Sequence, residues 1–210
     1  MTTTVLKVDN VAAKITLLRI DELKPHEKGS SFYLELLRRE ILKDGMLKYP
    51  IIVDEKTHVI LDGMHRWLAL KSFGYELIPV ILTDVSKDKI HVGKRRIHRY
   101  TNGTDKEITV EKVISAGLSG RLMEPRSTRH FFPFSKFQEI NFPLCSLKKR
   151  EAQDVSGYLA RLTAKESNVA LGQWLEEISE ELEFLSRRME EVEREKEEFL
   201  NRVKGSISKF

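Results

Sequence analysis

The first 90 residues alternate short apolar runs with stretches in which apolar residues recur every three or four positions. The short runs are rich in Ile, Leu and Val and are bounded by turn residues, so they predict strands at residues 15–20, 50–53, 58–61 and 77–82. The helical spacing predicts one helix from Ser30 or Ser31 to Gly45 and another that ends at Gly74. This pattern predicts an α+β fold with helices packed on a small mixed sheet.

Individual residues add detail to this domain. The turn at residues 54–57 predicts a hairpin between the strands on either side of it. Pro79 lacks a backbone N–H, so we expect strand 77–82 to lie at an edge of the sheet or to end there. Thr109 suits the N-cap of a helix that ends at Gly117. Three later aromatic residues are expected in the core: Phe131, Phe132 and Phe134.

The pattern changes from about residue 151. Apolar residues then follow a three-four spacing among many glutamates, which predicts a heptad seam at Trp174, Ile178, Leu182, Leu185, Met189, Val192, Phe199 and Val203. We therefore divide the chain into a domain at 1–150 and a helical, coiled-coil-like extension at 151–210. The seam can pair with a second copy to form a homodimer or fold back on the domain, and the sequence leaves both alternatives open.

Charge and cysteine content narrow the class of protein. The formal charge of +4 combines −5 in residues 151–210 with +9 in residues 1–150, and a basic domain suits nucleotides, polyphosphates or nucleic acid. The acidic extension argues against DNA. The chain contains no run of about 18 apolar residues, its N-terminus lacks the layout of a secretory signal, and Cys145 is its single cysteine. We expect a cytoplasmic protein without a membrane span, an internal disulfide or a cysteine-based metal site.

The segment from Leu61 to Trp67 carries the first candidate chemistry. Asp62 and Gly63 lie at the corner between a predicted strand and a predicted helix, and a glycine there lets backbone approach a ligand closely. The helix N-terminus offers N–H groups and a positive dipole end, while His65 and Arg66 add donors that suit phosphate oxygens. The corner therefore favours an anionic, phosphorylated ligand. The alternative is an ordinary helix cap and tight turn.

Two later segments are rich in basic residues. In the first, Arg126 and Arg129 bracket the hydroxyls of Ser127 and Thr128 and precede His130, which is a dense set of phosphate-binding groups. An ordinary charged surface loop is the alternative. In the second, the basic cluster Lys94–Arg99 is either a solvated face or a patch that faces a ligand.

Three segments together resemble the free serine kinases of the ParB/sulfiredoxin superfamily. These enzymes phosphorylate L-serine to O-phosphoserine with a nucleoside di- or triphosphate. Leu23-Lys24-Pro25-His26-Glu27 is similar to their Lys-Pro-His-Glu segment, and Asp62-Gly63-Met64-His65-Arg66-Trp67 to their Asp-Gly-His-His-Arg-Trp motif. Ser127-Thr128-Arg129-His130 is similar to their Thr-Thr-Arg-His motif. The resemblance covers roughly residues 15–135 and implies a ParB/sulfiredoxin-like fold.

The resemblance also implies roles for these residues. Glu27 matches the family's catalytic glutamate, and Ser127, Thr128, Arg129 and His130 match the motif that completes the phosphate and substrate site. Asp62 either shares the catalytic task of Glu27 or holds Mg²⁺ through water, and the sequence leaves these roles unseparated. The co-substrates implied are L-serine and either ATP or ADP.

Other members of the superfamily define the alternatives. Sulfiredoxins have a nucleophilic cysteine at the position of Met64, and a thioether has no ionisable proton with which to serve as that nucleophile. The alternative to a kinase is a nucleotide-binding ParB-like regulator, or a DNA-binding protein, that catalyses no phosphoryl transfer. A nuclease is a third alternative, but no carboxylate cluster of the two-metal type supports it.

Overall fold

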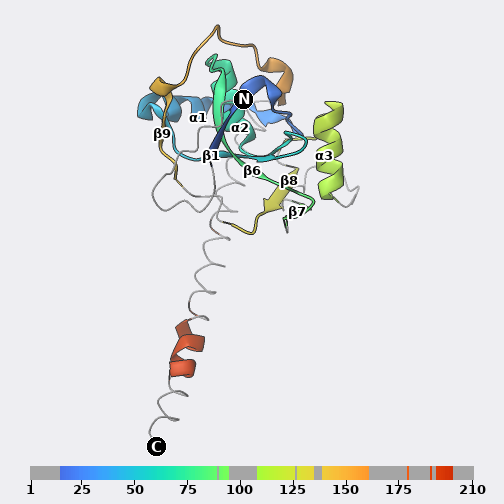
Figure 1. Cartoon of the computed structure of the whole chain (residues 1–210), viewed down its shortest axis with the longest axis vertical. Coiled ribbons are helices and arrows are strands. Elements are labelled where there is room, and N and C mark those ends of the chain that lie inside the picture. Colours follow the sequence, from blue (N-terminus) through green and yellow to red (C-terminus); the bar gives the residue numbers. More distant parts are fainter. Residues whose placement is uncertain are drawn as a thin grey trace, which may run out of the picture. The chain divides into compact units, whose positions relative to one another are not determined.

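The computed structural model describes residues 15–88, 90–94, 108–125, 127–134, 139–160, 179, 190 and 193–200. Contacts within the chain divide it into two compact units, Met1–Leu162 and Thr163–Phe210. The division expected from the sequence, after residue 150, lies inside the first unit. We describe each unit by itself (Figure 1).

A four-stranded mixed sheet lies at the centre of the first unit. Its strands, in spatial order, are β1 (Ile15–Arg19), β6 (Leu77–Thr83), β4 (Ile51–Asp54) and β5 (Ile60–Asp62). The β1–β6 and β4–β5 pairs are antiparallel, whereas β4 and β6 run parallel. The predicted strands, the hairpin and the mixed α+β class are confirmed.

The two predicted helices are also confirmed. Helix α1 (Ser31–Asp44) begins after Ser30 and ends at Gly45, which has a left-handed φ of 64°. Helix α2 (Met64–Ser72) packs against α1 and is buried on almost every side. The indole N–H of Trp67 donates to the Ile20 carbonyl oxygen at 2.9 Å, so the polar atom of this buried ring is satisfied.

Pro79 does not mark an edge strand, and that expectation was wrong. Strand β6 lies between β1 and β4, and Pro79 is opposite Leu17 of β1. The parallel ladder with β4 begins one residue later, at Val80 opposite Ile51. An interior strand can therefore accept proline here, because the β4 ladder starts just beyond the residue that lacks an N–H.

Helix α3 (Val110–Ser119) begins as predicted but is longer than predicted. The Thr109 side chain accepts a hydrogen bond from the Lys112 backbone N–H, which confirms the cap. The helix continues past Gly117 to Ser119, and Gly120 is its C-cap. A Cβ on Gly117 would lie 2.6 Å from the Val59 side chain, so this glycine allows close packing of α3 on the hairpin rather than ending the helix.

Short paired strands complete the first unit. Strand β7 (His91–Lys94) pairs with β8 (Thr128–Phe131), β3 (Met46–Leu47) with β9 (Phe142–Pro143), and β2 (Gly29–Ser30) with β10 (Leu159–Ala160). In the described part of the unit, short 3-10 helices span Ile20–Glu22 (η1), Leu144–Ser146 (η3) and Ser156–Tyr158 (η4). In Figure 1, β9 lies beside α1 at one side of the unit, and α3 lies at the other.

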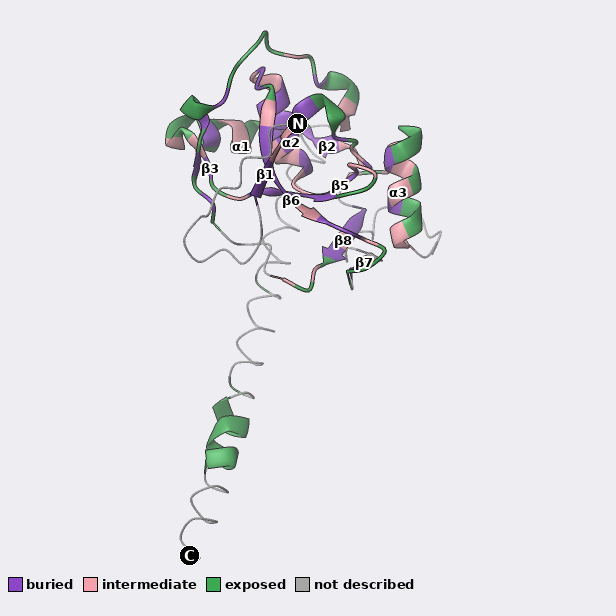
Figure 2. Ribbon diagram, in the orientation of Figure 1, coloured by how far each residue is buried: buried purple, intermediate pink, exposed green. Residues whose placement is uncertain are grey.

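The core forms two apolar clusters. The larger contains Trp67, α2 and most of the sheet, and the smaller contains Val59, Ile90 and Val113. Buried residues concentrate in the strands and in α2 (Figure 2). The expectation that Phe131 lies in the core was wrong, since it is 49% exposed, while Phe132 and Phe134 are half-buried against the smaller cluster.

The segment 139–160 runs over the first unit as a strap. The Arg150 N–H donates to the Gly74 carbonyl at 2.8 Å, and the Glu76 N–H donates to the Lys148 carbonyl at 3.1 Å. The ammonium of Lys71 and the guanidinium of Arg150 both contact the carboxylate of Asp21, and they lower its pKa to about 2. Backbone hydrogen bonds therefore tie the strap to the turn after α2, and the Arg150–Asp21 pair ties it to residues 20–22.

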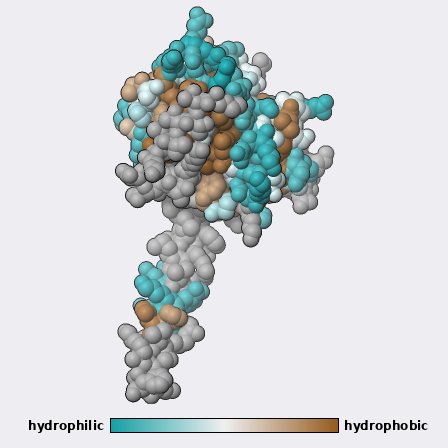
Figure 3. All heavy atoms as spheres, in the orientation of Figure 1, coloured by the Kyte–Doolittle hydropathy of each residue, from teal (hydrophilic) through white to brown (hydrophobic). Residues whose placement is uncertain are grey.

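In the second unit, residues 193–200 are helical and exposed, including Phe199 and Leu200. The space-filling view shows the described part of this unit as mostly hydrophilic, with a small hydrophobic patch (Figure 3). The other predicted seam residues, and the side chains of the Lys94–Arg99 cluster, lie outside the described residues. Within the described ranges, no helix is long and apolar enough to cross a membrane.

The strap contact at Gly74 gives a stability prediction. Gly74 has a φ of 80°, and a Cβ there would lie 2.3 Å from the Arg150 carbonyl oxygen. We expect Gly74→Ala to lower the free energy of unfolding by about 3 kcal/mol, because left-handed strain of about 1–2 kcal/mol is added to a backbone clash. Urea denaturation measures this loss.

The matched control is Gly45→Ala. Gly45 has a similar φ of 64°, but a Cβ there meets no atom within 4 Å, so only the conformational strain is added. Equal losses of stability in the two variants would contradict the predicted role of the strap contact.

Candidate functional site

The segment that carries Glu27 is held on both sides by backbone hydrogen bonds. On one side Lys24 pairs with the hairpin, donating to His58 and accepting from Ile60, both at 2.9 Å. On the other, the Met123 N–H donates to the His26 carbonyl and the Lys28 N–H to the Met123 carbonyl, again at 2.9 Å. Glu27 therefore lies on a short extended segment between two others, although no long strand contains it.

The Glu27 carboxylate contacts the late motif directly. Its side chain is 12% exposed, and its Oε2 accepts a hydrogen bond from the Ser127 N–H at 3.1 Å. The Thr128 Oγ1 lies 3.4 Å from the same oxygen. Residues 100 positions apart thus meet at one carboxylate oxygen, as the sequence motifs require if they form one site.

His26 joins all three motif segments. The buried ring places Nδ1 2.6 Å from the Ile60 carbonyl oxygen, two residues before Asp62, and Nε2 2.9 Å from the Thr128 Oγ1. Burial lowers the pKa of His26 to about 4, against the smaller opposing effects of the Ile60 hydrogen bond and the Asp62 charge. The ring is therefore neutral at neutral pH, and it links the strand before the corner to the late motif.

The corner between β5 and α2 has the backbone expected of an anion site. The N-cap residue of α2 is Gly63, which has a φ of 95° and no side chain with which to cap the helix. The Trp67 N–H makes the first intrahelical bond, to the Gly63 carbonyl at 3.0 Å. The preceding first-turn N–H groups lie at the positive end of the helix, where anions are stabilised.

Arg66 is held within this corner. Its guanidinium donates to the Asp62 Oδ2 and to the Pro50 carbonyl oxygen, each at 2.5 Å. A Cβ on Gly63 would lie 3.0 Å from the guanidinium, so the backbone and this side chain are closely packed. Asp62 and Arg66 therefore form an ion pair that braces the turn.

His65 connects α2 to the start of α1. Its Nε2 accepts a hydrogen bond from the Ser30 N–H at 2.8 Å, which requires that this nitrogen carry no proton. Its ring also lies edge-on to Tyr33, with the ring centroids 5.9 Å apart. His65 thus faces the N-terminal end of α1.

The pleat of β8 separates the residues of the late motif. Thr128 and His130 are buried, and the His130 ring lies edge-on to His26 at 5.4 Å. Alternate residues of a strand point to opposite faces, and the Arg129 guanidinium accordingly lies over the exposed Phe131 ring at 5.3 Å. Thr128 and His130 therefore face the Glu27 segment, whereas Arg129 lies on the other face of the strand.

The sequence motifs identified most of the residues that meet here but assigned no role to His26. The signal was its place in the Lys24–Glu27 segment, where it precedes the catalytic candidate directly. Arg126, which the sequence grouped with the phosphate-binding residues, lies outside the described residues. Among the residues that the structure describes, no group of three or more His, Cys, Asp or Glu could hold a metal ion by itself.

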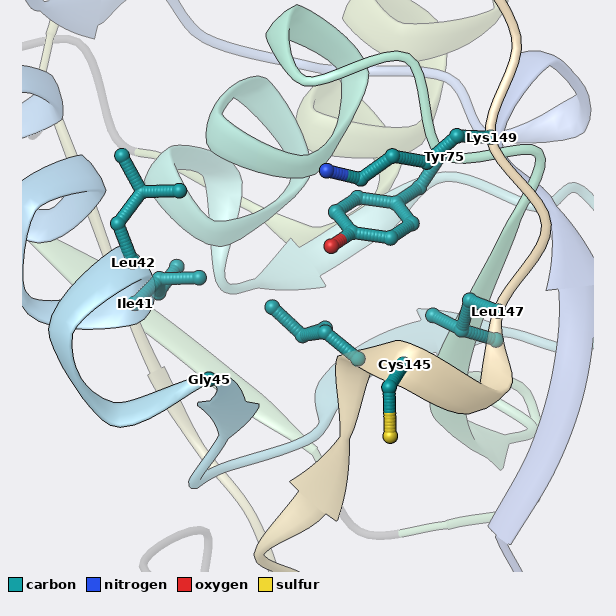
Figure 4. Close-up of a pocket in the computed structure, with 8 residues that line it drawn as sticks. Ile41, Leu42, Gly45, Tyr75, Cys145, Leu147 and Lys149 are labelled. Carbon is teal, nitrogen blue, oxygen red and sulfur yellow. The ribbon is translucent and has the colours of Figure 1, made fainter.

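A separate pocket of about 470 Å³ opens on another part of the first unit (Figure 4). Its lining is mainly apolar and contains none of the predicted site residues: Ile41, Leu42, Gly45, Tyr75, Leu144, Cys145, Leu147 and Lys149. The residues predicted from the motifs therefore lie away from this pocket.

Comparisons with known proteins support the family resemblance. The chain is 33% identical over 91 residues to an ATP-dependent L-serine kinase of Staphylothermus marinus, covering 41% of this chain and 35% of that protein. It is 38% identical over 73 residues to a ParB-like protein of Sulfolobus acidocaldarius, covering 34% of this chain and 35% of that protein. The chain thus aligns with about a third of the length of each relative. No protein-family model matches it.

A solved structure, of a free serine kinase in complex with AMP, has the same fold. It superposes with a TM-score of 0.57 at 17% identity, covering 69% of this chain and 99% of that one. The resemblance to the free serine kinases and to ParB-like proteins, first seen in three short motifs, is confirmed by these relatives and by this shared fold.

The buried neutral state of His26 predicts a pH dependence of stability. The unfolded chain binds a proton at His26 below its ordinary pKa of 6.5, but the folded protein does so only near pH 4. Protons therefore stabilise the unfolded state in that interval, and the free energy of unfolding falls as the pH is lowered from 6.5 to 4. The full difference corresponds to about 3 kcal/mol.

His26→Gln removes this contribution, and the exposed His91→Gln is the matched control. Urea denaturation between pH 4 and 7 should give a shallower pH dependence for His26→Gln than for either the wild type or His91→Gln. Parallel curves for all three proteins would show that His26 is not kept neutral by folding.

Proposed function

We propose that the protein is a kinase that transfers a phosphoryl group from ATP or ADP to the hydroxyl of free L-serine, giving O-phospho-L-serine. The observation that carries the proposal is the meeting of the Glu27 carboxylate with Ser127 and Thr128, while His26 ties this junction to the strand that enters the Gly63 corner. The relatives support it, since one is named an L-serine kinase.

In this mechanism the chain positions the reactants and balances charge, which is most of what phosphoryl transfer requires of a protein. The backbone at Gly63 and the first turn of α2, with His65, receive the nucleotide phosphates. Ser127 closes the phosphate site and His130 contributes to the serine site, while Arg129, on the other face of β8, is assigned no contact to the phosphates. The Arg66 guanidinium is bound to Asp62 and to the Pro50 carbonyl, so we propose that Arg66 supports phosphate binding by holding the turn in place.

Glu27 acts as the general base. It accepts the proton of the serine hydroxyl while the serine oxygen bonds to the terminal phosphorus and the bond from that phosphorus to the nucleotide oxygen breaks. The Ser127 N–H orients the carboxylate for this task at 3.1 Å. Asp62 is the second acidic residue of the site, and its role is to brace the turn by pairing with Arg66.

Mg²⁺ bound to the nucleotide would neutralise charge on the phosphates. The described residues contain no cluster that would hold an ion alone, and Mg²⁺ is commonly bound through substrate phosphates and water with few carboxylates. We therefore propose that the ion arrives with the nucleotide. This arrangement is compatible with ATP or ADP, because both present a terminal phosphoryl group.

We further propose a cytoplasmic protein that dimerises through residues 174–203 and does not bind nucleic acid. The support for dimerisation is the heptad spacing and the exposure of Phe199, 60%, and Leu200, 44%, on the described helical residues 193–200. Large apolar side chains exposed on a helix are typical of a surface that pairs.

Glu27→Gln tests the kinase proposal. Incubation with L-serine, Mg²⁺ and either ATP or ADP should yield phosphoserine with the wild type. The variant should lose at least about 100-fold in turnover, because the amide cannot accept the proton, while nucleotide affinity measured by calorimetry changes little. Glu35→Gln, on the exposed face of α1, is the matched control and should keep full activity.

Two results would contradict this proposal. Near-normal turnover by Glu27→Gln would exclude Glu27 as the base. Nucleotide binding by the wild type without phosphoserine from either donor would favour a ParB-like regulator.

Phe199→Asp tests the dimer. Sedimentation of the full chain should give a dimer for the wild type and for the control Glu197→Gln, and a monomer for Phe199→Asp, because a charge in the seam opposes pairing. A wild-type monomer at concentrations of about 100 μM would exclude the proposed interface, since a specific dimer binds more tightly than that.

A further inference from the structure

His26 has no part in the transfer as proposed, yet it is buried beside Glu27, with Nε2 at 3.9 Å from Glu27 Oε2, and makes two hydrogen-bonding contacts. It is 3% exposed, with Nδ1 at 2.6 Å from the Ile60 carbonyl oxygen and Nε2 at 2.9 Å from Thr128 Oγ1. These contacts belong to a chain of hydrogen-bonding groups that runs from the Ile60 carbonyl through His26 and Thr128 to Glu27 Oε2. The direction of each hydrogen bond in this chain follows from the chemistry of its members.

The Ile60 carbonyl sets the tautomer of the ring. A carbonyl oxygen can only accept, so Nδ1 must carry a proton. Burial lowers the pKa of His26 to about 4, so the ring has no second proton at neutral pH. Nε2 is therefore an acceptor, and it needs a donor because the site is buried.

The Thr128 hydroxyl is that donor. It has a single proton, which goes to Nε2 at 2.9 Å rather than to Glu27 at 3.4 Å. The lone pairs of Thr128 Oγ1 then face Glu27 Oε2. In this orientation the oxygen has no proton to donate to an ionised carboxylate. It can accept a hydrogen bond from a protonated carboxyl group.

We propose that His26 and Thr128 are positioning residues that prepare Glu27 to take the proton of the acceptor hydroxyl. This inference rests on the proposed kinase function. As the serine oxygen bonds to phosphorus and the nucleotide leaves, the hydroxyl proton moves to Glu27. The new carboxyl O–H then donates to Thr128 Oγ1, whose own proton stays on His26 Nε2. Thr128 is thereby assigned to the base rather than to the phosphates.

Other ionisable groups lie close to this chain of hydrogen bonds, and the Thr128 variants do not alter them. The Asp62 carboxylate, which is paired with Arg66, favours a proton on His26. The His130 ring lies edge-on to the His26 ring, with the centroids 5.4 Å apart. These groups act on the His26 ring alike in the wild type and in variants of Thr128. A shift in the pH profile of such a variant therefore reports the loss of the hydroxyl.

The test compares Thr128→Val with Thr128→Ser in the full chain. Thr128→Val removes the oxygen, so kcat for phosphoserine formation should fall about tenfold or more with KM for the nucleotide within about twofold. The acidic limb of the pH–kcat profile should move to lower pH, because the protonated form of Glu27 loses its acceptor. Thr128→Ser restores the hydroxyl and should recover kcat to within about threefold of the wild type.

A second measurement is independent of activity. The ¹⁵N NMR shifts of His26 in the wild type should show a protonated Nδ1 and an unprotonated Nε2 at pH 7, and Thr128→Val should move the Nε2 signal. Thermal melting identifies a variant that fails to fold. In that case His26→Gln, whose side-chain oxygen can accept from Thr128, is compared with His26→Leu, which cannot, and only the former should keep kcat.

Several outcomes would overturn the inference. One is a rise in nucleotide KM with unchanged kcat in Thr128→Val, which would assign the hydroxyl to phosphate. Another is a loss in Thr128→Ser equal to that in Thr128→Val. A proton on Nε2 in the wild type would also overturn it. If the wild type makes no phosphoserine, the kinase proposal fails, and the NMR shifts still decide the hydrogen-bond chain.

Discussion

The buried ring of His26 is the interaction on which the candidate site depends. It receives the Thr128 hydroxyl and donates to the Ile60 carbonyl, and so connects three segments that are 34 and 102 residues apart in the chain. An imidazole can make both bonds only when it is neutral, which burial ensures. The same ring that holds the segments together also determines the direction of the hydrogen bonds that reach Glu27.

Residues that are adjacent in sequence have different structural roles at this site. At the corner, the Asp62–Arg66 pair braces the backbone, and the N-cap residue of α2 is Gly63. On β8, the strand pleat turns Thr128 and His130 toward the Glu27 segment and Arg129 toward Phe131. A motif that is continuous in sequence is therefore divided between two faces. Its residues need not all reach the same ligand.

The strap explains why the first unit extends to Leu162. Its apolar residues Leu144, Leu147 and Val155 enter the larger core cluster, and β10 pairs with β2, which carries the Ser30 N–H bound by His65. The change in composition near residue 151 marks where glutamates and heptads begin to dominate. Contacts rather than composition decide where a compact unit ends, because a short polar strap can still be held by backbone hydrogen bonds.

The sequence by itself determined the strands, the two main helices and the glycine that ends α1, because hydrophobic period and glycine position are local properties. It also identified Glu27, the Gly63 corner and Ser127–Thr128 as members of one motif set. Tertiary structure alone decided that Pro79 lies in an interior strand, that Gly117 is a packing contact and that His26 links the site. Each of these depends on a neighbour distant in sequence, and no local pattern records which atoms that neighbour will present.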